Sequence, residues 1–169
     1  MEKRWIALYV ENQPGVLAKI SSLFAGKAYN MGSLTVGTTE DETVSRMTIS
    51  VHADDITFEQ IKKQLNRMVE VIKVIDLSDQ KIHMKELLYV KVKNLDANAK
   101  NEVFHVADTF SAGGYCQIVD YGEDSVIMAA LLTDHRNDEL IALLKKEFKH
   151  IEVVRGGSVA IESISTSCR

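Results

Sequence analysis

The sequence contains a single proline, two cysteines and no uninterrupted apolar run longer than seven residues. A membrane-spanning helix needs about 20 apolar residues, so the longest run, Val126–Leu132, is far too short to cross a bilayer. Cys116 and Cys168 lie far apart in the chain and define no disulfide framework, which predicts a reducing, cytoplasmic location. The charged amino terminus has only a short apolar run and no small-residue cleavage site, so it predicts a strand rather than a signal peptide.

The chain also lacks an excess of basic residues. Residues 1–79 carry nine Lys and Arg against eleven Asp and Glu, and residues 80–169 carry eleven against thirteen, for a net charge of −4. Neither half is therefore expected to bind nucleic acid or an anionic membrane surface. The composition, 46% hydrophobic and 26% charged, is that of a globular protein.

Motifs of catalysis and metal binding are missing as well. There is no P-loop, no dinucleotide-binding glycine motif and no nucleophile elbow. Cys116 lies in a predicted strand and is interpreted as a small core residue, and the acidic cluster 40–42 as a solvated turn. The histidines show no metal-ligand spacing; they are His52, His83, His105, His135 and His150. No local motif implies a reaction, and no metal or cofactor is expected in this chain.

The first half of the sequence predicts the order strand, helix, strand, strand, helix, strand. The segments are a strand at 4–10, a helix from Gly15 with Val16, Leu17, Ile20, Leu23 and Phe24 on one face, strands around Leu34–Val36 and Val44–Val51, a helix through Ile61, Leu65 and Met68, and a strand at 69–77. Asp54 or Asp55 is placed to cap the second helix.

The second half repeats this order. Its segments are a strand at 87–92, a helix with Val103, Val106, Ala107 and Phe110 on one face that ends at Gly113-Gly114, strands at 115–121 and 125–132, a helix through Leu140, Ile141, Leu144 and Phe148, and one or more closing strands at 150–164. The sequence thus predicts an α+β fold of two βαββαβ units, each an antiparallel sheet with its helices on one face. We place the domains at 1–77 and 84–164, with a linker at 78–83 and a tail at 165–169.

The segment 11–17 (ENQPGVL) connects the first strand to the first helix. Asn12 or Gln13 precedes the helix, Pro14 stands at or next to its first position, and Gly15 leaves no side chain over its first turn. Free N–H groups and the positive end of the helix dipole form a site for a carboxylate there. The same residues are also typical of an ordinary helix start, which local sequence alone favours.

A second element is Tyr29-Asn30-Met31, which follows the first helix. Asn30 suits a left-handed cap at the end of that helix. Taken together with the segment 11–17 in a βαββαβ frame, it supplies polar side chains for a small zwitterion.

Segments along nearly the whole chain resemble the small regulatory subunit family of acetolactate synthase. The resemblance rests on EN-x-x-GVL, a first helix ending in LF, then YN, SLTV and SRMTI, and continues through QIKKQLNRMVEVIKVIDL. It is weaker in the second half, at KELLYVKV, QIVDY and IEVVRGGSVAI. The resemblance implies two tandem ferredoxin-like units, the first of them an ACT domain.

By this resemblance, the chain is a non-catalytic subunit that activates a catalytic large subunit and confers feedback inhibition by valine or a related amino acid. The effector lies between two ACT domains of a homodimer. The matching contact residues are Asn12, Gly15, Val16, Leu17, Asn30 and Met31. Thiamine diphosphate, Mg²⁺ and FAD belong to the large subunit, which condenses two pyruvates, or pyruvate with 2-oxobutyrate. Ala28 and Gly32 depart from the family's usual glycine and acidic residue at those positions.

Two other classes of protein share parts of this pattern. A stand-alone tandem ACT regulator of another enzyme or of transcription would have the same frame, but is not expected to share SLTV, SRMTI and the second half. A small ferredoxin-like enzyme such as an acylphosphatase needs an arginine in a glycine-rich loop, and the segment 11–17 has none.

Overall fold

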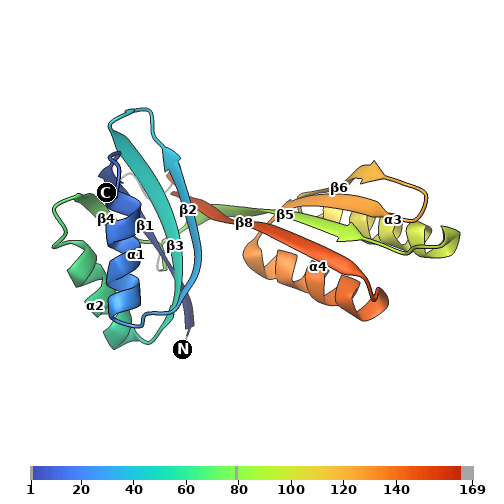
Figure 1. Cartoon of the computed structure of the whole chain (residues 1–169), viewed down its shortest axis with the longest axis horizontal. Coiled ribbons are helices and arrows are strands. Elements are labelled where there is room, and N and C mark those ends of the chain that lie inside the picture. The colour runs from blue at the N-terminus through green and yellow to red at the C-terminus, as the bar shows by residue number, and fades with distance from the viewer. Residues whose placement is uncertain (1, 79, 165–169) are drawn as a thin grey trace. The chain divides into compact units, whose positions relative to one another are not determined.

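The computed structural model describes residues 2–78 and 80–164. Its elements are β1 (Glu2–Glu11), α1 (Val16–Gly26), β2 (Met31–Thr38), β3 (Val44–Ala53), α2 (Asp55–Leu65), β4 (Val71–Asp76), β5 (Ile82–Val92), α3 (Ala97–Ser111), β6 (Tyr115–Tyr121), β7 (Val126–Leu132), α4 (Asp134–Glu147) and β8 (Ile151–Glu162). They form two βαββαβ units, which confirms the predicted α+β class and the element order (Figure 1). Cys168 and the tail 165–169 lie outside the described residues.

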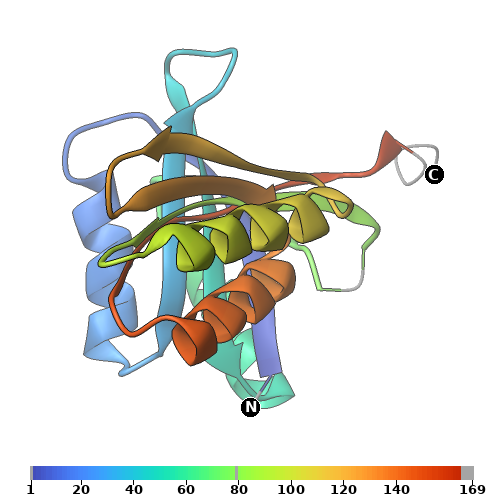
Figure 2. The ribbon, with the colours of Figure 1, turned by 90° about the vertical axis from the view of Figure 1, so that its right-hand side faces the viewer.

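The described residues divide into a first unit of residues 2–78, 80–83 and 158–164 and a second unit of residues 84–157. The first sheet has the antiparallel strand order β2-β3-β1-β4, and the second has the order β6-β7-β5-β8. In each unit two helices cover one face of the sheet, α1 and α2 in the first and α3 and α4 in the second (Figures 1 and 2). The closing segment Ser158–Ile164 packs with the first unit, although it is continuous with the second sheet through β8.

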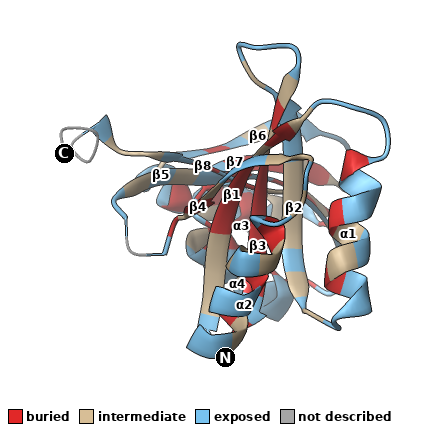
Figure 3. Ribbon diagram, turned by 90° about the vertical axis from the view of Figure 1, so that its left-hand side faces the viewer, coloured by how far each residue is buried: buried red, intermediate tan, exposed pale blue. Residues whose placement is uncertain are grey.

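Each unit has its own apolar core between sheet and helices, as the burial colouring shows for the first unit in Figure 3. Inward residues alternate along β1 and β3, where Leu8 and Ile49 are fully buried. On α1 the buried positions are Val16, Ile20 and Phe24. The prediction that Leu17 belongs to this buried stripe is wrong, because its side chain is 44% exposed. Leu17 follows Val16 by only 100° around the helix, and the sheet covers just the Val16 side.

Helix ends are set by short polar side chains at three of the four helices. Asp54 accepts a hydrogen bond from the Thr57 N–H at 2.8 Å, which confirms the predicted cap of α2. Asp96 and Thr133 cap α3 and α4 in the same way. The α2 stripe is Phe58, Ile61 and Leu65, and the helix ends before Met68, which was wrongly placed in it. None of the helices in the described ranges 2–78 and 80–164 is long and apolar enough to cross a membrane.

Candidate functional site

The loop between β1 and α1 is held by the β2–β3 turn. The backbone N–H of Asn12 donates to the Thr43 carbonyl at 2.7 Å, and its side-chain Nδ2 donates to the Glu42 carbonyl at 2.8 Å. The turn is ordered by Asp41, whose carboxylate accepts from the Thr43 hydroxyl and N–H. These two hydrogen bonds lower the pKa of Asp41. The Glu40–Glu42 cluster is therefore a solvent-exposed turn, as predicted, and its backbone also positions Asn12.

Gly15 determines the chemistry at the start of α1. It is the N-cap residue, in a left-handed conformation with φ of 90°, and no side chain within the described residues caps the helix. An L-residue rarely adopts this conformation, so glycine is needed here for the backbone rather than for space. The Val16 N–H donates to the Gln13 carbonyl at 3.3 Å, and the N–H groups of Leu17 and Ala18 are the first-turn donors left for an acceptor from outside the described residues. Pro14 lies before the cap rather than in the first helical position.

The six predicted effector residues differ in exposure. Asn12, Gly15 and Asn30 are exposed, and Leu17 presents nearly half of its side chain to solvent. The Val16 side chain is buried in the first core, so only its backbone faces the loop. Met31 is half-buried and packs against the same core at the start of β2.

Asn12 and Asn30 lie at opposite ends of the first sheet. Glu11, next to Asn12, pairs with Val44, whereas Met31, next to Asn30, pairs with Val51. These partners are seven residues apart on β3, which is about 23 Å along an extended strand. A single copy of the first unit therefore does not bring the two asparagines into one site.

The structure describes the two positions that depart from the resembled family pattern. Ala28, which replaces the usual glycine, adopts the left-handed φ of 54° that a glycine would take more readily. The left-handed residue predicted after α1 is thus Ala28 rather than Asn30. Gly32 lies in an irregularity of the β2–β3 pairing, where an added Cβ would approach the Ser50 hydroxyl to 2.9 Å. An acidic side chain does not fit there unless Ser50 moves.

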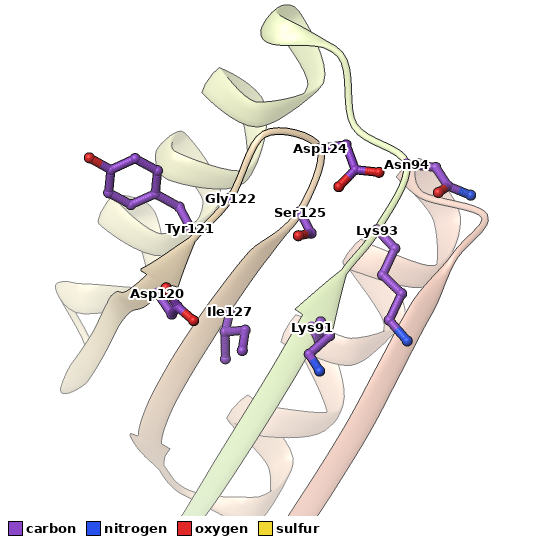
Figure 4. Close-up of a pocket in the computed structure, with 9 residues that line it drawn as sticks. All are labelled: Lys91, Lys93, Asn94, Asp120, Tyr121, Gly122, Asp124, Ser125 and Ile127. Atoms are coloured by element: carbon purple, nitrogen blue, oxygen red, sulfur yellow. The ribbon is translucent and has the colours of Figure 1, made fainter.

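The second unit contains a hollow of about 380 Å³ (Figure 4). It lies where β5 ends and where β6 turns into β7, the end of this sheet that corresponds to the Asn12 loop of the first unit. Lys91 and Lys93 of the β5 end and its following loop line it, together with Asp120 and Asp124 of the β6–β7 hairpin. Lys93 is paired with Glu152 at 2.7 Å. This mixture of charges shows no nucleophile with a base, and no group of His, Cys, Asp or Glu in the described part of the chain has metal-binding geometry.

Cys116 has the properties of a core residue. It is 2% exposed and belongs to the core of the second unit. Burial raises the pKa of its thiol to about 11, so the thiolate needed for nucleophilic attack is scarce at neutral pH. The interpretation of Cys116 as a small buried side chain is confirmed.

Comparison with known proteins places both units in one family. Residues 6–73 match the model of the acetolactate synthase small subunit-like ACT domain, and residues 85–164 match the small subunit of acetolactate synthase. The chain belongs to the acetolactate synthase small-subunit family. Small subunits of this enzyme from Haemophilus influenzae and Aquifex aeolicus are 36% and 37% identical, over 94% and 95% of this chain and 94% and 81% of their own lengths.

The fold of the acetolactate synthase small subunit from Thermotoga maritima is similar along the whole chain. Its crystal structure superposes with a TM-score of 0.82 at 31% identity, covering 96% of this chain and 98% of that one. Membership of the family implies a non-catalytic, regulatory role in branched-chain amino-acid synthesis. Because the match extends through both units, it favours a small subunit over a stand-alone tandem ACT regulator.

Sequence reasoning missed the importance of Arg46, which it noted only as a polar position in a strand. The guanidinium donates to the Tyr9 hydroxyl at 2.7 Å and to the Ala160 carbonyl at 2.9 Å. Its side chain is only 18% exposed. The sequence does contain an indication of this role, because Arg46 is a single arginine among small and apolar residues in SRMTIS. A charged side chain in a largely buried strand usually has a partner.

Proposed function

We propose that this chain activates the catalytic large subunit of acetolactate synthase and makes it sensitive to valine or a related branched-chain amino acid. The uncapped start of α1 at Gly15, beside the exposed Leu17, is the observation that carries the effector part of the proposal. Thiamine diphosphate, Mg²⁺ and FAD are assigned to the large subunit, where pyruvate condensation takes place. The work of this chain is allosteric, with reciprocal coupling between effector binding and activity.

The proposed site matches the groups of an amino acid. The first-turn N–H groups of Leu17 and Ala18 receive the carboxylate, which the positive end of the helix dipole also stabilises, while the Val16 N–H donates to the Gln13 carbonyl. The Asn12 side chain donates to Glu42, so its Oδ1 is available to accept from the ammonium group. Leu17 offers apolar contact to the side chain of the ligand. Asn30 and Met31 of a second copy complete the site.

The geometry of the first sheet supports a homodimer through β2. Its edges are β2 and β4, and β2 (MGSLTVGT) contains no charge and no proline, the usual protections of an exposed edge. β4, in contrast, carries Lys73 and Asp76. Antiparallel pairing of two β2 strands about a twofold axis brings Asn30 of one copy toward the Asn12 end of the other. In the proposed dimer, Asn12 of one copy and Asn30 of the other therefore contribute to the same site.

A charge on β2 is expected to weaken this dimer. Val36→Lys places an ammonium group on a 46% exposed position of β2, where two copies meet, and like charges facing across paired strands are destabilising. Sedimentation at micromolar concentration should show a shift toward monomer. The matched control is Ile72→Lys on β4, also exposed, which should stay dimeric. An unchanged mass for Val36→Lys would contradict pairing through β2.

The proposed function is tested by reconstitution. The purified chain alone should form no acetolactate, and its addition to a cognate large subunit should raise the rate of acetolactate formation. Valine, leucine and isoleucine are then titrated into the complex, and at least one should lower the rate. Condensation of pyruvate by this chain alone, or a large subunit indifferent to it, would rule the proposal out.

A further inference from the structure

The segment Ser158–Ile164, which we call the C-terminal strap, lies against the first sheet on the face opposite the helices. Thr48 and Ser50 point to that face because they alternate along β3 with core residues, and both are at most 4% exposed. Ser158 and Ala160 of the strap are buried to a similar degree. The strap is the end of β8, whose earlier part is a strand of the second sheet.

Arg46 joins the strap to the first sheet. Its Nη2 donates to the Ala160 carbonyl at 2.9 Å and to the Glu162 carboxylate at 3.2 Å, while Nη1 donates to the Tyr9 hydroxyl at 2.7 Å. The guanidinium also lies over the Tyr9 ring, 5.1 Å from its centre. Burial acts to raise the pKa of Glu162, but hydrogen bonds, including that from Arg46, keep the pKa below its ordinary value. The Arg46 side chain on β3 therefore contacts Tyr9 on β1 and both Ala160 and Glu162 of the strap.

The same contacts lead directly to the proposed effector loop. Tyr9 is on β1, three residues before Asn12 in the loop that follows it. Arg46 is on β3, three residues after Thr43 in the turn that precedes it. Asn12 is hydrogen-bonded to the turn at Glu42 and Thr43. A ligand that displaces Asn12 therefore also displaces the adjoining ends of β1 and β3, the strands that carry Tyr9 and Arg46.

A second contact links the strap to β2, the proposed dimer edge. The Thr35 hydroxyl donates to the Ser158 carbonyl at 2.8 Å. Between Thr35, Arg46 and Val159 there is a cavity of about 230 Å³. The strap is thus fixed by a few polar contacts and is not packed tightly on this side, so small movements of β2 and β3 can change its position.

We propose that Arg46 couples effector occupancy of the loop to the C-terminal strap, and that β8 carries the change into the second unit. This inference rests on the proposed function, since it concerns how the same effector site controls the enzyme. The two states are a strap held by Arg46 and Thr35 and a strap released from them. The proposal requires the effector to bind one of these two states more tightly than the other, so that its binding shifts their populations.

The test measures binding and inhibition separately in the complex with the large subunit. Arg46→Met removes the guanidinium and keeps an unbranched apolar side chain, and Thr35→Val removes a single hydrogen bond and leaves the charges intact. Each variant should bind valine with an affinity within about fivefold of wild type by calorimetry, yet the ratio of uninhibited to inhibited rate at saturating valine should fall at least about fivefold. Arg67→Met, a change at an exposed arginine, is the control and should be inhibited as wild type is.

Hydrogen exchange provides a readout that loss of stability alone would not imitate. Valine should change the exchange rate of amides in 158–164 severalfold in wild type and leave it unchanged in Arg46→Met. Full inhibition of both variants, or a strap whose exchange in wild type ignores valine, would overturn the coupling role. Loss of valine binding in both variants would also overturn it, because the strap would then belong to the binding site. A wild-type chain that binds none of the three amino acids refutes the effector part of the proposed function, and the coupling falls with it.

Discussion

A Gly15→Asp chain is expected to lose effector binding and still activate the catalytic subunit. The substitution puts a carboxylate at the N-cap of α1, next to the N–H groups proposed to receive the carboxylate of the ligand. Two unit charges about 4 Å apart near a protein surface repel by about 4 kcal/mol, which corresponds to roughly a thousandfold loss of affinity. The residues of the first core are untouched, because an added Cβ at Gly15 meets no atom within 4 Å.

The backbone of Gly15 requires its own control. With φ of 90°, any L-residue is strained there by about 1–2 kcal/mol, whether or not it is charged. Gly15→Ala carries this strain without the charge and should weaken valine binding much less than Gly15→Asp. Calorimetry with valine, leucine and isoleucine compares the two variants, and the reconstituted complex gives the activation. Equal affinities for wild type and Gly15→Asp would show that the effector binds elsewhere.

A mixture of two defective chains tests the composite site. Asn30→Ala removes a hydrogen bond to the ligand and should cost about 1–3 kcal/mol of binding. In a heterodimer of Gly15→Asp with Asn30→Ala, one site contains both changes and the other contains neither, if each site combines the loop of one copy with Asn30 of the other. The heterodimer should therefore bind half the valine of wild type with unchanged affinity. If both residues of a site came from one copy, no intact site would form.

The sequence predicts those parts of the fold that depend on local pattern. Alternating strands and helical spacing gave two βαββαβ units. Asp54 or Asp55 was the predicted cap of α2, which the structure assigns to Asp54, because capping needs only residues within one turn. Leu17 was misassigned since the helical pattern cannot tell which neighbouring positions the sheet covers. The left-handed residue after α1 was placed at Asn30, the better candidate by propensity, whereas the chain path into β2 requires it at Ala28.

Contacts between distant segments were not predictable from local pattern. Arg46 and Glu162 are 116 residues apart, and nothing in either neighbourhood indicates that the end of β8 turns onto the first sheet. The separation of Asn12 from Asn30 likewise follows from strand register, which the sequence did not define. The candidate site, including its place between two copies, was predicted by resemblance, and the strand register shows only that Asn12 and Asn30 of one copy lie far apart.

Removal of Arg155 is expected to be the most destabilising surface substitution in the second unit. Its guanidinium donates to both carboxylate oxygens of Glu86, at 3.0 and 2.6 Å, and to Asp138 at 2.5 Å. Glu86 is 3% exposed, and its only other side-chain partner within the described chain is Asn137 on α4, at 3.1 Å. These hydrogen bonds, that to Glu86 first, raise the pKa of Arg155, so its guanidinium stays charged. Arg155→Met leaves a buried carboxylate without its cation.

Breaking a buried ion pair from one side costs about 3–5 kcal/mol, and the partial exposure of Arg155 favours the lower end of that range. At about 3 kcal/mol, the melting temperature of the chain should fall by about 6–12 °C in a thermal unfolding scan. Lys93→Met, which removes the exposed ion pair with Glu152, is the matched control and should lower the melting temperature much less than Arg155→Met, because water screens this pair. The double variant Glu86→Gln/Arg155→Met should be more stable than Arg155→Met alone, because it removes the orphaned charge. Equal losses for Arg155→Met and Lys93→Met would mean that water reaches Glu86 and that the buried pair does not hold β5, β8 and α4 together.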